Sequence, residues 1–246
     1  MRLTELKGIG KKREECFNKL GINSVEDVVK DFPLRYEDRT SVGNIDQLKD
    51  GVSQVIYAKL SKLNRIVYLR GKKTIQKGLF SDETGTVEVR WYNQKFIYRS
   101  LHLGDSYCIF GRYNAEYKAI INPKIYLGEI EDFTGISPIY RLVDGVSNSV
   151  RISAAKEAIE KTALSKFEIL SKDFLEKSEV WDINKIIKEL HFPTDIDYLY
   201  RARSDMSFRN WIVFLLSVME RKRIRKAEKS PDIKDVDIDK FEKTLS

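Results

Sequence analysis

The stretch that decides the fold is LFSDETGTVEVRWYNQKF, residues 79–96. Asp82 to Gly85 forms a turn sequence, and Val87, Val89 and Trp91 then alternate with other residues, as in a half-buried strand. Residues 75–80, ahead of the turn, are predicted to be the neighbouring strand. The two segments predict a β-hairpin at the centre of a β-domain.

Further strands are expected on both sides of this hairpin. One begins over residues 55–59, and two more cover 107–112 and 119–125. Residues 94–101 are more helical than extended. Three strands, a short helix and two strands match the five-stranded barrel of an OB-fold. The fold class expected is α+β, with an OB-fold barrel flanked by helices.

Helices are expected before and after the barrel. The first covers residues 11–20, and Ser24 caps a second that ends near Asp31, ahead of Pro33. Residues 128–148 read as an irregular connector. The later helices are expected over residues 152–164, 183–190, 198–203 and 208–226. The domains expected are 1–45, 46–148, 149–228 and a charged tail, 229–246.

The charge is concentrated in the barrel. Residues 54–127 hold 13 Lys and Arg against 5 Asp and Glu, while the whole chain of 246 residues carries only +7. The same stretch has 12 of the 27 aromatic residues. Cations that meet phosphates and rings that meet bases are typical of a nucleic-acid surface, although strands also favour aromatic residues.

Several other classes of protein are disfavoured. Two cysteines, Cys16 and Cys108, cannot form a disulfide scaffold or a four-cysteine zinc site and read as small core residues. The longest apolar run, residues 211–218, is too short to span a membrane, and the first residues do not form a signal peptide. No P-loop or catalytic constellation is present. We expect a reduced, cytoplasmic, soluble monomer without a metal or cofactor of its own.

The first candidate binding feature is the turn around Gly8 and Gly10, followed by Lys11 and Lys12. It is similar to a helix-hairpin-helix motif, in which backbone N–H groups at a helix N-terminus accept a phosphate oxygen. A tight turn that packs a helical bundle without any ligand explains the same residues.

The second feature follows the strand that ends at Trp91. Trp91 continues the inward alternation and is expected in the core, so Tyr92 faces outward, and Phe96 would share its face on a helix or wide turn. Exposed rings of this kind can stack on bases. The alternative is that Phe96 closes the end of the barrel.

The third feature is a set of basic residues, four of which flank the loop between the first two strands, a usual contact region of OB-folds. A solvated hairpin tip is the alternative. The set consists of Arg65, Arg70, Lys72, Lys73, Lys77 and Arg90.

At this point a family resemblance is visible in short motifs that run in order along residues 3–225. The chain resembles the N-terminal region of the RecG family of bacterial ATP-dependent DNA helicases. The motifs are LKGIGKK (6–12), LGI (20–22), VED (25–27), FPLRYEDR (32–39), LFSD (79–82), TGT (84–86), WYNQ (91–94), GD (104–105), NP (122–123), ISPIY (136–140), LHFP (190–193) and AR (202–203).

The resemblance implies a wedge that binds stalled replication forks and Holliday junctions and splits their arms in recombination and repair. The family's stacking rings map to Tyr92 and Phe96, and the junction contacts expected around them are Asn93, Gln94, Lys95 and Arg99. ATP and Mg²⁺ would serve the family's motor, whose motifs should begin just after Ser246. The sequence departs from the family at residues 204–206 and at Arg209, which leaves the role of the last helix open.

Two other functions are compatible with the sequence. A general single-strand-binding barrel would use the same face without preferring forks. A protein-interaction scaffold would bind a partner, or the tail of a single-strand-binding protein, and would have little affinity for DNA at physiological salt.

Overall fold

The computed structural model describes residues 1–227 of the chain. It contains two compact units, Met1–Ala202 and the chain from Arg203 onward, which are described separately. Within residues 1–227, no helix is long and apolar enough to cross a membrane. The charged tail expected at 229–246 lies outside the described residues, and the domain boundaries expected from the sequence stay predictions.

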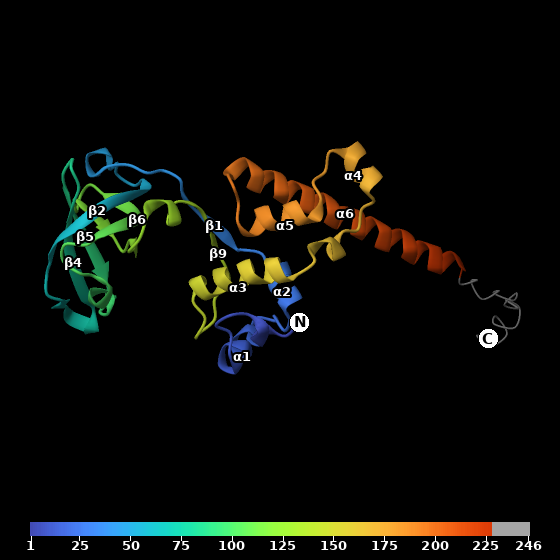
Figure 1. Cartoon of the computed structure of the whole chain (residues 1–246), viewed down its shortest axis with the longest axis horizontal. Coiled ribbons are helices and arrows are strands. Elements are labelled where there is room, and N and C mark those ends of the chain that lie inside the picture. Colours follow the sequence, from blue (N-terminus) through green and yellow to red (C-terminus); the bar gives the residue numbers. More distant parts are fainter. Residues whose placement is uncertain (228–246) are drawn as a thin grey trace, which may run out of the picture. The chain divides into compact units, whose positions relative to one another are not determined.

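A closed five-stranded barrel forms the β-domain (Figure 1). Its strands pair in the order β2-β4-β5-β7-β6, and β6 pairs back onto β2 to close the barrel. The β5–β7 pair is parallel and the other pairs are antiparallel. The expectation of an OB-fold barrel in an α+β protein is therefore confirmed. The strands are β2 (Ser53–Leu63), β4 (Thr74–Ser81), β5 (Thr86–Tyr92), β6 (Ser106–Asn114) and β7 (Ala119–Ile121).

Aromatic side chains fill the barrel. Phe80 makes edge contacts with Trp91 and Tyr107, at centroid separations of 6.2 and 6.1 Å. Burying one large apolar side chain of this kind stabilises a fold by roughly 1.5–3 kcal/mol. Gly78 faces this core, where an added Cβ would lie 3.1 Å from the Phe80 ring and 3.3 Å from Leu60. A larger residue at this position would require the Phe80 and Leu60 side chains to shift by a few tenths of an ångström.

Two details of the barrel differ from expectation. The last strand, expected over 119–125, breaks at Asn122, whose φ is +46°. The first part, β7, pairs with both β5 and β6, whereas the second part, β8 (Lys124–Tyr126), pairs with β6. Pro123 has no N–H and cannot continue a strand ladder. The helix expected over 94–101 is only the 3-10 turn η4 (Ile97–Ser100). The β2–β4 connection contains β3 (Val67–Tyr68) and η3 (Arg70–Lys72).

The segments immediately before and after the barrel pair with each other in a two-stranded ribbon. It joins β1 (Arg35–Arg39) to β9 (Gly135–Ile139) in antiparallel register. The sequence prediction of short helices over 1–40 and an irregular connector over 128–148 was wrong for these two segments. Both β1 and β9 are short and show only a weak alternation of apolar and polar residues. Each forms a strand because it pairs with the other, about 100 residues away along the chain. The Tyr36 hydroxyl of β1 donates to the Leu190 carbonyl.

Helices form the rest of the first unit. The capping box of α2 is confirmed, because Asp27 N–H donates to Ser24 Oγ and the Asp27 carboxylate accepts from Ser24 N–H. The short helix α4 was not expected. The α-helices are α1 (Lys11–Lys19), α2 (Val25–Lys30), α3 (Asn148–Lys161), α4 (Lys172–Ser178) and α5 (Ile183–His191), and the remaining 3-10 turns are η1 (Leu3–Glu5), η2 (Ile45–Gln47), η5 (Ile130–Asp132) and η6 (Leu164–Phe167).

A buried polar cluster joins α2, α3, α5 and the segment after β9. Arg151, only 1% exposed, bonds to Asp31, and its guanidinium lies 5.0 Å from the ring centroids of both Phe17 and Tyr140. Tyr140 Oη and His191 Nδ1 are 2.8 Å apart, and His191 Nε2 lies 2.8 Å from the Val29 carbonyl oxygen. Because a carbonyl only accepts, Nε2 carries the proton and Nδ1 accepts from the tyrosine.

Two further expectations need correction. A single helix, α6 (Ile196–Ala227), replaces the two helices expected over 198–203 and 208–226. Residues 204–207 are modest helix formers, but they include no Gly or Pro that would end a helix. Cys108 is buried as expected, whereas Cys16 is only half-buried.

Candidate nucleic-acid interface

One end of the barrel carries a groove of about 500 Å³ between the β2–β4 connection and the turn after β5. Three rings lie along it, and two of them are strongly exposed: Tyr68 at 73% and Phe96 at 62%. Exposed rings at these positions do not fill the core, so Phe96 does not close the barrel. The lining residues are Leu63, Asn64, Arg65, Ile66, Tyr68, Gln76, Lys95, Phe96 and Tyr98.

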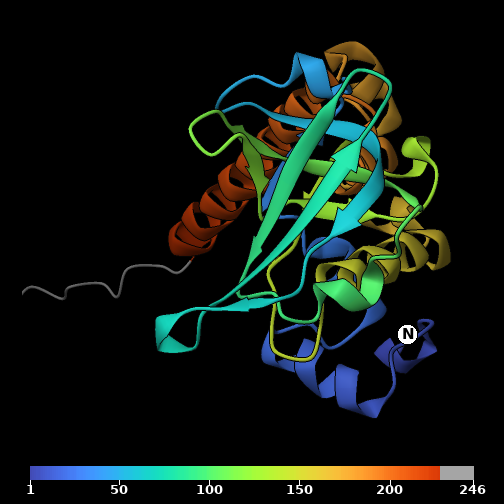
Figure 2. The ribbon, with the colours of Figure 1, turned by 90° about the vertical axis from the view of Figure 1, so that its left-hand side faces the viewer.

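Cations surround this groove. Arg65 and Lys95 line it, and the Arg99 guanidinium lies 4.8 Å from the Phe96 ring centroid. The β3–η3 tip extends beyond β4 and β5 (Figure 2) and carries more cations. Within residues 1–227, none of these side chains forms an ion pair, so their charge is available to an anionic ligand. The tip cations are Arg70, Lys72 and Lys73.

Lys77 and Arg90 differ from the other predicted phosphate contacts. Both pair with Glu88, Lys77 at an Nζ–Oε1 distance of 3.3 Å. Partial burial would raise the pKa of Glu88, but hydrogen bonds from Arg90 and Lys77 outweigh it and hold that pKa below its usual range. Arg90 also lies 5.5 Å from the Tyr117 ring centroid. These two cations are therefore partly neutralised within the barrel.

The two predicted stacking rings lie on different elements. Tyr92 ends β5 on the strand's outer side, and its N–H donates to Asn122 Oδ1 over 2.7 Å. Phe96 follows a turn and lines the groove, which Tyr92 does not. The two residues do not lie on one helix, because η4 begins only at Ile97. The alternative expectation, that a wide turn gives both rings a common face, stays a prediction. Their stacking roles stay predictions.

Asn93 has a clear structural role. Its φ is +58°, a conformation that asparagine tolerates better than most residues. Its N–H donates to the Thr74 carbonyl over 2.9 Å, and its Oδ1 accepts from Thr74 N–H over 3.2 Å. Asn93 thereby fixes the turn that presents Gln94, which is exposed, and Lys95.

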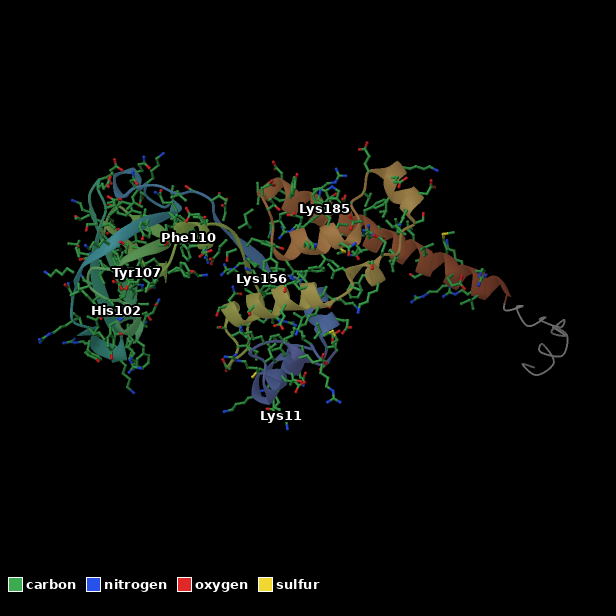
Figure 3. The ribbon with its side chains drawn as sticks, viewed as in Figure 1. Lys11, His102, Tyr107, Phe110, Lys156 and Lys185 are labelled. Carbon is green, nitrogen blue, oxygen red and sulfur yellow. The ribbon has the colours of Figure 1, made fainter. Side chains whose placement is uncertain are left out.

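The helix-hairpin-helix-like turn packs against α3. Gly8 has a φ of +79°, and Gly10 is the N-cap of α1. Lys7 N–H donates to the Glu157 carboxylate over 2.7 Å, so an internal anion already occupies one donor of the turn. Lys11 and Lys12 are exposed, and Figure 3 shows Lys11 on the outer side of this helical segment, whereas His102 lies on the barrel. The phosphate contact proposed there stays a prediction.

Of the nine residues that line the groove, six were not predicted from the sequence, and three of these six bear on ligand contact. Tyr68 and Tyr98 add rings beside Phe96, and Gln76 lines the groove from an inward-facing position of β4. The signal for Tyr68 was an aromatic residue within the basic loop, between Arg65 and Arg70. Gln76 had only the weaker signal of a polar residue in the buried register of a strand.

The topology and the groove together define the class: an OB-fold barrel with an exposed groove lined by aromatic and positively charged side chains. The family model that matches is the RecG wedge domain, over residues 3–162. The chain belongs to the RecG wedge domain family. This match confirms the family resemblance found in the sequence.

Curated relatives carry the same family name. The ATP-dependent DNA helicase RecG of Staphylococcus epidermidis is 25% identical over 246 residues, covering 99% of this chain and 36% of that protein. RecG of Thermotoga maritima is 27% identical over 230 residues, covering 89% and 29% respectively. A solved structure of RecG bound to a three-way DNA junction matches with a TM-score of 0.74 and 25% identity, over 92% of this chain and 32% of that one. The chain thus spans about a third of the length of these relatives.

Proposed function

We propose that this chain is the junction-binding wedge of a RecG-type ATP-dependent DNA helicase. It would bind stalled replication forks and Holliday junctions during recombination and repair. The observation that carries the proposal is the exposed Phe96 ring in a groove lined by Arg65 and Lys95, neither of which pairs with a carboxylate within residues 1–227. The family membership supports the same conclusion.

The wedge would bind at the branch point of the junction and act as a rigid obstacle between its arms. Unpaired cations at the barrel end would neutralise phosphates, which gives affinity without reading sequence. Tyr92 and Phe96 would stack on the base pairs at the branch point and replace part of the base stacking lost there. Recognition would depend on branched shape.

Strand separation would need a motor as well as a wedge. We propose that ATP and Mg²⁺ serve that motor, which pulls duplex DNA against the barrel while this chain binds the junction as a monomer in the cytoplasm. The wedge itself would then need no cofactor.

Competition among DNA substrates tests the proposal. Fluorescence anisotropy with a labelled three-way fork, duplex and single strand is expected to give several-fold tighter binding to the fork. The double variant Tyr92→Ala/Phe96→Ala should lose that preference, because each stacked ring contributes about 1–3 kcal/mol. Its salt dependence should stay the same, since no cation is removed.

Tyr57→Ala is the matched control, because it removes an exposed ring from β2 outside the groove. Equal affinity for fork and single strand would favour a general single-strand binder. An unchanged double variant would refute the stacking roles. No binding at moderate salt would favour a protein-interaction scaffold, for example for the tail of a single-strand-binding protein.

A further inference from the structure

A buried glutamine lines the groove, and its side-chain oxygen makes no hydrogen bond within residues 1–227. Gln76 is 2% exposed and lines the groove. Its Nε2 donates to the Asn64 carbonyl, which fixes the orientation of the amide because a carbonyl can only accept. The remaining atom, Oε1, is buried and has no hydrogen-bond partner among residues 1–227. A buried acceptor without a hydrogen-bond partner destabilises the folded protein. A ligand that donates a hydrogen bond to this oxygen would therefore bind more tightly than one that does not.

The other groove residues indicate the kind of donor. Tyr68, Phe96 and Tyr98 offer aromatic surfaces, and Arg65 and Lys95 offer positive charge. Flat π faces, an N–H donor at one edge and a phosphate on the other side are the features of a nucleotide. The groove volume of about 500 Å³ falls in the range of small-molecule sites.

We propose that this groove captures the first unpaired base of a separated strand, and that Gln76 Oε1 accepts a hydrogen bond from the base's Watson–Crick edge. Every DNA base has an N–H donor on that edge, but in a duplex the opposite strand already uses it. The acceptor would therefore select unpaired bases over paired ones without selecting a sequence. Capture would oppose re-annealing behind the wedge, and in this respect the inference rests on the proposed function.

A competing partner for Gln76 lies within the barrel. Trp91 is its cross-strand neighbour, and in the part of the chain that the structure describes the buried Trp91 indole N–H also has no hydrogen-bond partner. Trp91 does not line the groove. If Gln76 Oε1 accepts a hydrogen bond from the Trp91 indole N–H, Gln76 stabilises the barrel and does not bind the ligand. The experiment must separate these two roles.

The decisive comparison changes the DNA and leaves the protein intact. A fork with a single-stranded gap at its branch is prepared with adenine, purine (adenine without its amino group) or an abasic site as the first unpaired nucleotide. Anisotropy should show about two- to tenfold weaker binding of the purine fork than of the adenine fork, as expected for one neutral hydrogen bond. The abasic fork should bind more weakly still, because stacking is lost as well.

Protein variants then locate the effect. Gln76→Met keeps the volume but removes the acceptor, and it should bind adenine and purine forks equally. Tyr68→Ala should weaken binding of the adenine fork about tenfold and that of the abasic fork little, whereas Tyr57→Ala should change neither.

Equal binding of adenine and purine forks by the wild-type protein would overturn the proposal. So would a Gln76→Met variant that is less stable but still discriminates adenine from purine, because that result assigns Gln76 to Trp91. The same adenine–purine comparison in a short single strand tests the groove even if fork preference is absent, so failure of the junction function and failure of the base site are distinguishable.

Discussion

At the scale of single residues, His191 shows how burial sets a charge state. It is fully buried, and desolvation lowers its pKa from 6.5 to about 4, while its hydrogen bond to the Val29 carbonyl acts in the opposite direction. The ring is therefore neutral at pH 7, with Nε2 donating and Nδ1 accepting. Burial also raises the pKa of Tyr140, which stays protonated and can donate to Nδ1.

This histidine should make the fold sensitive to acid. In the unfolded chain His191 binds a proton below pH 6.5, whereas in the fold it does so only below about pH 4. Stability is therefore lost as the pH falls from about 6.5 to about 4, by about 3 kcal/mol over the whole interval. Urea unfolding of the wild type and of His191→Gln at several pH values in this range measures the effect. The variant is expected to be less stable at pH 7 but to have a shallower pH dependence.

His102→Gln is the natural control, because His102 is the second histidine of the chain and is exposed. A pH dependence that changes with His102→Gln and not with His191→Gln would contradict the assignment.

At the scale of elements, the β3–η3 tip and the outer side of β4–β5 should contribute differently to DNA binding. Lys73 at the tip forms no ion pair within residues 1–227, whereas Lys77 is paired with Glu88 at 3.3 Å. Lys73→Ala should reduce the slope of log affinity against log salt by about 0.7–0.9, one phosphate contact. Lys77→Ala should reduce it by much less. Anisotropy titrations of a fork at several salt concentrations measure both slopes, and equal reductions would mean that the Glu88 pair opens on binding.

Elements with local signals were predictable from the sequence. The turn at residues 82–85 and the capping box at Ser24 depend on neighbours a few residues away, and both lie where expected. The β1–β9 ribbon depends on pairing between Tyr36 and Pro138, which no local pattern announces. The break at Asn122 was missed because an alternating pattern does not show where a strand leaves one of its two partners, here β5.

The site was predictable in part, for the same reason. Composition identifies the exposed cations of the loop, and the inward alternation of β5 correctly assigns Trp91 to the core. Which side chains share the groove depends on how the β2–β4 connection meets the turn after β5. Tyr68 and Gln76 come from the first of these segments and its strand, whereas Phe96 comes from the second. The spacing of residues along the chain does not reveal that these two segments lie close together in space.

At the scale of the whole molecule, one buried ion pair ties together segments that lie on either side of the barrel in the sequence. Asp31 follows α2, and Arg151 lies in α3 with its side chain 1% exposed. Asp31→Ala should destabilise the protein by about 3–5 kcal/mol, because the guanidinium stays buried without its anion. Urea unfolding measures the loss.

The double variant Asp31→Leu/Arg151→Met separates a buried-charge penalty from lost packing. Removing both charges should recover much of the stability, since an apolar pair of similar volume is often as stable as a buried ion pair. A double variant that is as unstable as Asp31→Ala would assign the loss to packing around Phe17 and Tyr140.

The ribbon has a consequence for how such a chain arises. Arg39 and Gly135 are cross-strand partners, so the chain leaves the helical segments and returns to them at neighbouring points. The entire OB-fold barrel is, in topological terms, an insertion into a helical host that a tight turn between β1 and β9 would reconnect. A gene encoding this arrangement can lose, acquire or exchange the barrel in a single recombination event while the helical host is inherited intact.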